Sequence, residues 1–234
     1  MTRRALIAGA TGLVGECLLR ALLADPAYGA VRAFARRPLA VEHPKLVVDV
    51  IDFERLQDVR FPRVDDVFCC LGTTIAAAGS REAFRRVDFD YPLALARAAL
   101  AAHARRFLFV SAMGANPHST VFYSRVKGEL EQAVAGLGYR SVVAFRPSLL
   151  AGDRQQNRLG ERAALAVLQP LRLLVPRKYR PVAATAVAQT MIDCARRCPA
   201  GFTVIESDAL QESGATPAPP ARTPRSAARR NRRR

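Results

Sequence analysis

The sequence predicts an α/β protein: one doubly wound, mostly parallel sheet in a single domain, with a small helical extension at the C-terminal side. Two patterns carry this prediction. Apolar runs too short for a helix alternate along the chain with amphipathic segments of helical length. Most of these runs stop at glycine or at a polar residue, as parallel strands joined by crossover helices do. The 234 residues, half of them hydrophobic, can bury the core of one such domain.

The expected elements follow in chain order. A strand beginning at Ala5 is followed by a helix over 13–23. Further strands are expected at 30–35, 46–48, 67–71, 107–110, 141–145 and 202–205. Further helices are expected at 81–102, with a break near Asp90 to Pro92, and at 121–137, 159–174 and 183–196.

Three glycines with the spacing G-x-x-G-x-x-G connect the first strand to the first helix. Gly9 would let the chain turn sharply, Gly12 would let a pyrophosphate approach the backbone, and Gly15 would let the helix pack closely on the strand. Free amides and the positive dipole end of the helix would bind the phosphates. The pattern predicts a dinucleotide site; the alternative is a structural turn in another α/β protein. The predicted contacts are Gly9, Thr11, Gly12, Leu13, Val14 and Gly15.

Arg36 and Arg37 follow the second strand, where an NAD enzyme usually has an acidic residue for the ribose hydroxyls. A guanidinium would instead pair with a ribose phosphate, so we expect NADP(H) rather than NAD(H). The alternative is a solvated turn. Asp49 and Val50, at the end of the third strand, are expected to meet the adenine. Further cofactor contacts are predicted at Leu71, Gly72, Thr73, Lys127 and Pro147.

Ser111 ends the fifth strand, and Tyr123 and Lys127 follow with the spacing Tyr-x-x-x-Lys. This spacing places both side chains on one face of a helix, one turn apart. A free phenol has a pKa near ~10, and a nearby ammonium would move it towards the working range. Tyr123 would then transfer a proton while Ser111 hydrogen-bonds the substrate oxygen. The alternative is an ordinary surface pair on an exposed helix.

Together these motifs resemble the short-chain dehydrogenase/reductase superfamily, in its extended-like and atypical branches with a Rossmann domain. Arg146-Pro147-Ser148 resembles the segment that flanks the nicotinamide there. A narrower resemblance, to the oxidoreductases related to the Tat-interacting tumour-suppressor protein, rests on Cys70-Leu71-Gly72-Thr73-Thr74 and Phe84-Arg85-Arg86-Val87-Asp88. It covers about residues 3–207. Asp88 stands where extended members usually have asparagine, and the long C-terminal substrate domain of sugar-nucleotide epimerases is missing.

The resemblance implies an NADP(H)-dependent oxidoreductase that transfers hydride between the nicotinamide and a small carbonyl or alcohol. Tyr123 would be the general acid/base, Lys127 would orient the ribose, and Ser111 would hold the substrate oxygen. Two alternatives stay open. One is an NADP(H)-binding regulatory protein with little or no turnover, and the weaker one is an epimerase or dehydratase. The substrate itself does not follow from the sequence.

The net charge of +16 is partly concentrated at the C-terminal end, where seven arginines and no acidic residue follow Glu212. We expect residues 1–210 to form the Rossmann domain, with a compact substrate region at about 148–207. Residues 213–234 are expected to be a disordered Arg/Pro/Ala-rich tail, because they contain no large apolar side chain. We expect a solvated tail with no specific partner; the alternative is nonspecific contact of its basic end with nucleic acid or anionic lipid.

The five cysteines are an odd number in apolar surroundings, which indicates reduced thiols. The three histidines have no ligand spacing, so we predict no metal site. No apolar run approaches the roughly 20 residues needed to span a membrane. We therefore expect a cytoplasmic monomer or homodimer with a small-molecule substrate and no membrane partner.

Overall fold

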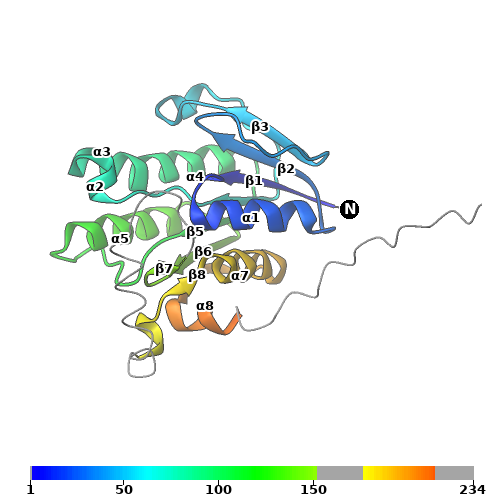
Figure 1. Cartoon of the computed structure of the whole chain (residues 1–234). Coiled ribbons are helices and arrows are strands. Elements are labelled where there is room, and N and C mark those ends of the chain that lie inside the picture. The colour runs from blue at the N-terminus through cyan, green and yellow to red at the C-terminus, as the bar shows by residue number, and fades with distance from the viewer. Residues whose placement is uncertain (1, 152–175, 214–234) are drawn as a thin grey trace, which may run out of the picture.

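Seven strands form one sheet in the order β3-β2-β1-β4-β5-β6-β9 (Figure 1). The structure, a computed structural model, describes residues 2–151 and 176–213. The strands are β1 (Arg3–Ala8), β2 (Tyr28–Ala35), β3 (Leu46–Val50), β4 (Asp66–Cys69), β5 (Arg106–Val110), β6 (Ser141–Arg146) and β9 (Gly201–Glu206). Every neighbouring pair in this sheet is parallel. The predicted fold class is confirmed.

The direction of winding changes between β1 and β4. From β1 the chain moves through β2 to the β3 edge, and it then returns to the other side of β1 to form β4. The connections that leave the carboxyl ends of β1 and β4 therefore separate, which in open sheets of this kind creates the crevice where ligands bind. The glycine motif follows β1, and the predicted contacts Leu71, Gly72 and Thr73 follow β4.

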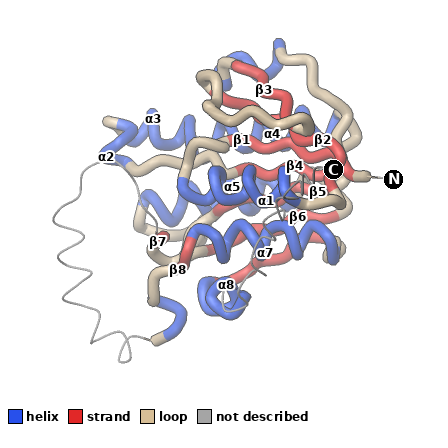
Figure 2. Tube along the Cα trace, turned by 45° about the vertical axis from the view of Figure 1, so that its right-hand side comes forward, coloured by secondary structure: helices blue, strands red, loops and turns tan. Residues whose placement is uncertain are grey.

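Helices cover both faces of the sheet because successive side chains of a strand point to opposite sides. On one face, Ala5 and Ile7 of β1 share a core with α1 (Leu13–Ala24) and α7 (Ala184–Arg197). On the other face, Leu6 and Ala8 share a core with α4 (Tyr91–Ala101) and α5 (Phe122–Ala135). Near the β9 edge, α8 (Ser207–Ser213) lies against α7 (Figure 2). With α7, which was predicted, and α8, which was not, the C-terminal part of the described chain is helical, in agreement with the expected helical extension.

The helix predicted over 81–102 has three parts, α3 (Arg81–Arg85), a π-helical turn η2 (Arg86–Asp90) and α4. The predicted break near Asp90 to Pro92 is wrong, because the chain stays helical through this region. Pro92 has no amide for the carbonyl of Asp88, and its ring crowds that carbonyl. A π turn widens the backbone there and accommodates the proline without ending the helix.

Several short elements were not predicted, because they lack a periodic apolar pattern. They are η1 (Phe53–Asp58), α2 (Ile75–Ala78), η4 (Arg177–Tyr179), α8, and the two-stranded parallel pair of β7 (Leu150–Ala151) and β8 (Val182–Ala183). The helix predicted at 159–174, with much of the substrate region, and the tail after 213 lie outside the described residues. Within the described ranges, no helix has the length and apolar character to cross a membrane.

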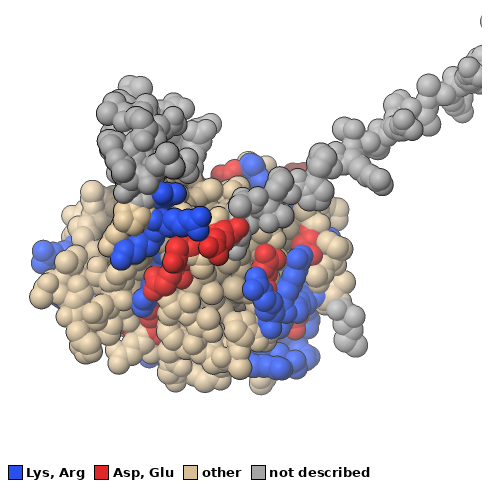
Figure 3. All heavy atoms as spheres, turned by 90° about the horizontal axis from the view of Figure 1, so that it is seen from below, with Lys and Arg blue, Asp and Glu red and all other residues tan. Residues whose placement is uncertain are grey.

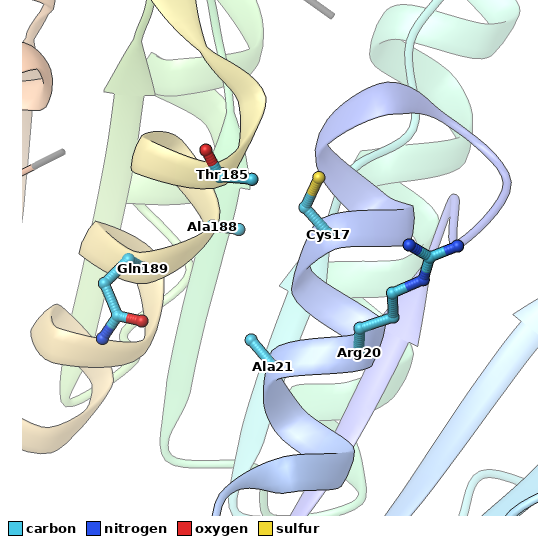
Figure 4. Close-up of a pocket in the computed structure, with 6 residues that line it drawn as sticks. All are labelled: Cys17, Arg20, Ala21, Thr185, Ala188 and Gln189. Carbon is cyan, nitrogen blue, oxygen red and sulfur yellow. The ribbon is translucent and has the colours of Figure 1, made fainter. Parts of the chain in front are cut away.

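A groove of about 370 Å³ lies between α1 and α7 (Figure 4). Its lining is Cys17, Arg20, Ala21, Thr185, Ala188 and Gln189. The small side chains of Ala21 and Ala188 line facing sides of the groove (Figure 4). None of the predicted site residues lines this groove.

The turn between β1 and α1 packs tightly against the end of β4. Gly9 has φ +85°, and a Cβ there would lie 2.5 Å from the backbone carbonyl atoms of Cys70. A Cβ on Gly15 would lie 2.1 Å from the carbonyl oxygen of Gly9. Both glycines are therefore required by packing within the chain itself, as the spacing predicts.

We expect Gly9→Ala to lower the free energy of unfolding by more than about 4 kcal/mol, since backbone overlap adds to the strain of a left-handed alanine. The matched control is Gly138→Ala, because Gly138 has φ +86° but open space around its missing Cβ. This control should lose only about 1–2 kcal/mol. Urea denaturation measures both, and equal losses would contradict the tight packing at Gly9.

Candidate functional site

The start of α1 is open to a ligand at Gly12. Gly12 is the N-cap residue of α1, and as a glycine it has no side chain that could cap the helix. A Cβ on Gly12 would come no closer to the chain than 3.4 Å, from the carbonyl oxygen of Gly9. Gly12 therefore differs from Gly9 and Gly15, where a side chain would overlap backbone atoms. The expected contact of Gly12 with a phosphate at this helix N-terminus stays a prediction.

Thr11, Arg36 and Arg37 line a hollow of about 310 Å³ beside this helix start. Thr11 follows β1, and the two arginines follow β2, so the hollow lies at the carboxyl ends of neighbouring strands. All three side chains are exposed. Neither arginine forms an ion pair with any residue in the described ranges. The hollow thus presents two uncompensated positive charges and a hydroxyl to a ligand.

Asp49 and Val50 lie at the end of β3, one strand further out. Both carboxylate oxygens of Asp49 accept hydrogen bonds from the guanidinium of Arg32 on β2. Val50 is 55% exposed at the end of its strand. The ion pair fixes the Asp49 carboxylate across the two strands, and its expected contact with adenine stays a prediction.

Tyr123 and Lys127 lie one turn apart near the start of α5, as predicted. The ring of Tyr123 packs at 5.4 Å from that of Phe84, and in the described structure its hydroxyl makes no hydrogen bond. The Lys127 ammonium is buried, and Nζ lies 2.7 Å from Oδ1 of Asp88. Burial acts to lower the pKa of Lys127, but the charge of Asp88 and the proximity of Tyr123 outweigh it and raise that pKa. Lys127 therefore stays protonated at neutral pH.

The loop after β4 meets Lys127 at the same place. The backbone amide of Thr73 donates a hydrogen bond of 2.8 Å to Oδ2 of Asp88. A Cβ on Gly72 would lie 3.4 Å from Oδ1 of Asp88 and 3.8 Å from Nζ of Lys127. Two groups of predicted nucleotide contacts, from the β4 loop and from α5, are therefore brought together. Leu71 precedes them and is partly buried.

Ser111 lies at the end of β5 but is 3% exposed, and its hydroxyl donates a 2.5 Å hydrogen bond to Oε1 of Glu131. Arg146 donates to both Glu131 oxygens, at 3.0 and 2.6 Å, and also contacts Glu206. The hydrogen bond with Glu131 raises the pKa of Arg146, so the guanidinium stays charged. The hydroxyl proton of Ser111 thus points to a buried carboxylate, and its predicted contact with substrate stays a prediction.

The loops after β5 and β6 are joined at Pro147. Its carbonyl accepts a 3.0 Å hydrogen bond from the amide of Met113, which places the segment after Arg146 beside the end of β5. Sequence reasoning did not select Glu131. The sequence does show that Glu131 lies one turn after Lys127 on the same face of the helix. If that face is buried, Glu131 is a second buried charge that requires a partner.

Charged side chains of both signs lie next to one another on the face that carries α7 and α8 (Figure 3). Arg196 contacts Asp25 at 2.6 Å, and Arg177 contacts Glu212 at 3.6 Å. Ion pairs account for part of the charge on this face. The predicted nucleic-acid contact concerns residues 213–234, nearly all of which lie outside the described structure. Among described residues, no group of three or more His, Cys, Asp or Glu could hold a metal ion.

Comparisons of the sequence identify relatives over much of its length. A family described as NAD(P)H-binding matches residues 9–138. HTATIP2 of Rattus norvegicus is 39% identical over 160 residues, which are 66% of each chain. FMP52-1, mitochondrial, of Scheffersomyces stipitis is 31% identical over 206 residues, 82% of this chain and 88% of that protein. The relationship thus extends well beyond the glycine motif.

Solved structures show the same fold at low sequence identity. A short chain dehydrogenase/reductase family oxidoreductase from Burkholderia thailandensis has a TM-score of 0.67 and 20% identity, covering 90% of this chain and 93% of that one. The dTDP-4-dehydrorhamnose reductase of Bacillus anthracis, solved with NADP, has a TM-score of 0.62 and 16% identity, covering 88% and 75%. These likenesses establish a fold of the short-chain dehydrogenase/reductase type.

The predicted cytoplasmic location is wrong in the light of these relatives. Several of the fungal proteins, from Scheffersomyces stipitis, Emericella nidulans and Candida glabrata, are named as mitochondrial. The cysteine pattern and the lack of a long apolar run do not distinguish the two locations, since reduced thiols and a folded α/β domain are compatible with both.

We expect Arg146→Met to lower the free energy of unfolding by about 3–5 kcal/mol, because it leaves the buried Glu131 carboxylate without its cation. Arg20→Met is the matched control, since it breaks an exposed pair with Glu16 whose N–O distance is also 2.6 Å. The control should lose less than about 1 kcal/mol. Urea denaturation compares the two, and a loss at Arg146 as small as that at Arg20 would contradict the structural role of the pair.

Proposed function

Because the chain belongs to the NAD(P)H-binding family, we propose that it is an NADP(H)-dependent oxidoreductase acting on a small carbonyl or alcohol. The observation that carries this proposal is the pair of Tyr123 and Lys127. A tyrosine whose hydroxyl has no hydrogen bond in the described structure lies one turn from a buried, charged lysine. Asp88 joins Lys127 to the β4 loop, since it also accepts a hydrogen bond from the Thr73 amide, at the carboxyl edge of the sheet, where ligands bind in this fold.

The proposed chemistry divides between nucleotide and protein. The nucleotide would supply or accept the hydride. In the reducing direction Tyr123 would donate its proton to the substrate oxygen, and in the oxidising direction it would take the proton back. Lys127 would stabilise the negative charge left on the phenol oxygen, since its own proton is retained at neutral pH. Gly12 and the first turn of α1 would hold the pyrophosphate.

The hollow at Thr11, Arg36 and Arg37 supports NADP(H) as the nucleotide. Its two arginines are exposed and without an ionic partner in the described ranges, and they follow the strand beside the predicted phosphate site. A guanidinium can form two parallel hydrogen bonds to a phosphate, whereas ribose hydroxyls offer it no charge. Asp49, near the end of the neighbouring strand β3, is already bonded to Arg32.

A second candidate is an NADP(H)-binding regulatory protein with little turnover. The geometry of Ser111 favours it, because this buried hydroxyl donates its proton to Glu131. A substrate oxygen would then receive a hydrogen bond from Ser111 only after that side chain turned. The two candidates share the nucleotide site and differ in whether hydride leaves the nucleotide.

Arg36→Ala tests the nucleotide assignment. We expect its affinity for NADPH to fall roughly 10- to 100-fold, the value of a lost hydrogen bond to a charged group, while its affinity for NADH stays unchanged. Arg55→Ala removes an equal charge from the exposed pair with Asp58 and should bind both nucleotides like the unchanged protein. Titration followed by nicotinamide fluorescence measures the affinities of both variants and of the unchanged protein for NADPH and NADH. Equal NADPH binding by the two variants would refute this role of Arg36.

Tyr123→Phe tests the proton transfer. We expect NADPH oxidation with a panel of small aldehydes and ketones to fall about 10²- to 10⁴-fold in kcat, with NADPH affinity retained. Tyr91→Phe is the matched control, since Tyr91 bonds the exposed Glu54 and lies outside the site. Unchanged turnover in Tyr123→Phe would exclude Tyr123 as the acid. An unchanged protein that binds NADPH but reduces nothing in the panel would favour the regulatory candidate.

A further inference from the structure

Asp88 is the most deeply buried acidic residue beside the proposed nucleotide site. It is 1% exposed and lies in the middle of the π turn Arg86–Asp90. Such turns are rare and occur often at functional sites, because the extra residue re-aims the side chains of one turn. Here the turn directs a carboxylate under the loop that follows β4.

The two oxygens of Asp88 hold two different elements. Oδ2 accepts the hydrogen bond from the amide of Thr73, and Oδ1 lies 2.7 Å from Nζ of Lys127. Oδ1 makes no hydrogen bond in the described structure besides this ionic contact. The carboxylate therefore joins η2, the β4 loop and α5 at one point. Gly72 lies directly above the pair, since a Cβ there would contact both charged groups.

The ammonium of Lys127 needs this partner because of its surroundings. The groups that face it are the carboxylate of Asp88, the phenol of Tyr123 on α5 and the thiol of Cys69 at the end of β4. Burial raises the pKa of the Cys69 thiol to about 12, so that thiol is neutral. Asp88 thus supplies the compensating negative charge, and without such a charge a buried lysine loses its proton easily.

Building on the proposed oxidoreductase function, we propose that Asp88 is a positioning residue that fixes Lys127 and the Thr73 amide relative to each other before the nucleotide binds. It would keep Lys127 charged and aimed at the nucleotide, and it would hold the β4 loop beside it. Asp88 itself, lying beneath Gly72, need not touch nucleotide or substrate. A merely structural ion pair would affect stability and leave the pH dependence of nucleotide binding unchanged.

The sign of the pH effect follows from Lys127. A contact that needs the ammonium is present below the pKa of Lys127 and is lost as the pH rises through it. Asp88 raises this pKa, so in the unchanged protein the loss occurs above the ordinary lysine range. Without the charge of Asp88, burial is the main influence on the pKa of Lys127 and lowers it. NADPH affinity is then lost at a lower pH.

The test is a titration with NADPH between neutral and alkaline pH for the unchanged protein and Asp88→Asn. The asparagine oxygen can still accept from the Thr73 amide, in which case the NH2 group of the asparagine, and no negative charge, faces Lys127. We expect the alkaline loss of NADPH affinity to begin about one pH unit or more lower in Asp88→Asn. The control is Asp25→Asn, which alters another buried carboxylate, paired with Arg196 at the C-terminal end of α1, and should keep the original pH profile.

An unchanged pH profile in Asp88→Asn would overturn the proposal, while a protein that binds no NADPH at any pH would overturn the proposed function instead.

If Asp88→Asn does not fold, Lys127→Met is compared with the double variant Asp88→Asn/Lys127→Met. The double variant should melt at a higher temperature than Lys127→Met, because it removes the unpaired carboxylate, and should bind NADPH equally weakly. No gain in melting temperature, or restored NADPH affinity, would overturn the proposal.

Discussion

The contact between Gly9 and Gly15 is the constraint on which the arrangement of the site depends. The carbonyl oxygen of Gly9 occupies space that any side chain at residue 15 would need, and the backbone at Cys70 occupies the corresponding space at Gly9. The start of α1 is thereby pressed against the ends of β1 and β4, where the winding of the sheet changes direction. Gly12 remains the open position of the three, and it is the one proposed to lie against the pyrophosphate.

Two buried ion pairs organise the other half of the site. Lys127 pairs with Asp88, and Glu131, one turn further along α5, pairs with Arg146. Burying a charge without a partner is costly, so Lys127 and Glu131 each fix the element that carries the partner. Through these pairs α5 holds η2 and the β4 loop at one end and β6 at the other. Tyr123 therefore stands on a helix whose position is set by electrostatics as well as by apolar packing.

Much of this organisation could be predicted from the sequence, because it depends on local patterns. Alternating apolar runs and amphipathic segments predicted the parallel sheet, and the spacing of Tyr123 and Lys127 placed them on one helix. The partners of buried charges could not be predicted, since Asp88 and Lys127, or Ser111 and Glu131, meet only in the folded chain. The π turn resolves a conflict between Pro92 and a continuing helix that the sequence alone presents as a break. The location was predicted wrongly because reduced thiols and the lack of a long apolar run are compatible with both compartments. The correction came from relatives that are named as mitochondrial.

We propose that NADPH binds across the ends of β1, β2 and β4 with its nicotinamide end at Lys127. A crystal structure of the protein grown with NADP⁺ tests this claim most directly. We expect the pyrophosphate over Gly12, the ribose phosphate in the hollow at Thr11, Arg36 and Arg37, and the second ribose within hydrogen-bond distance of Lys127. A nucleotide bound elsewhere on the chain, or bound here with its ribose phosphate turned away from both arginines, would contradict it.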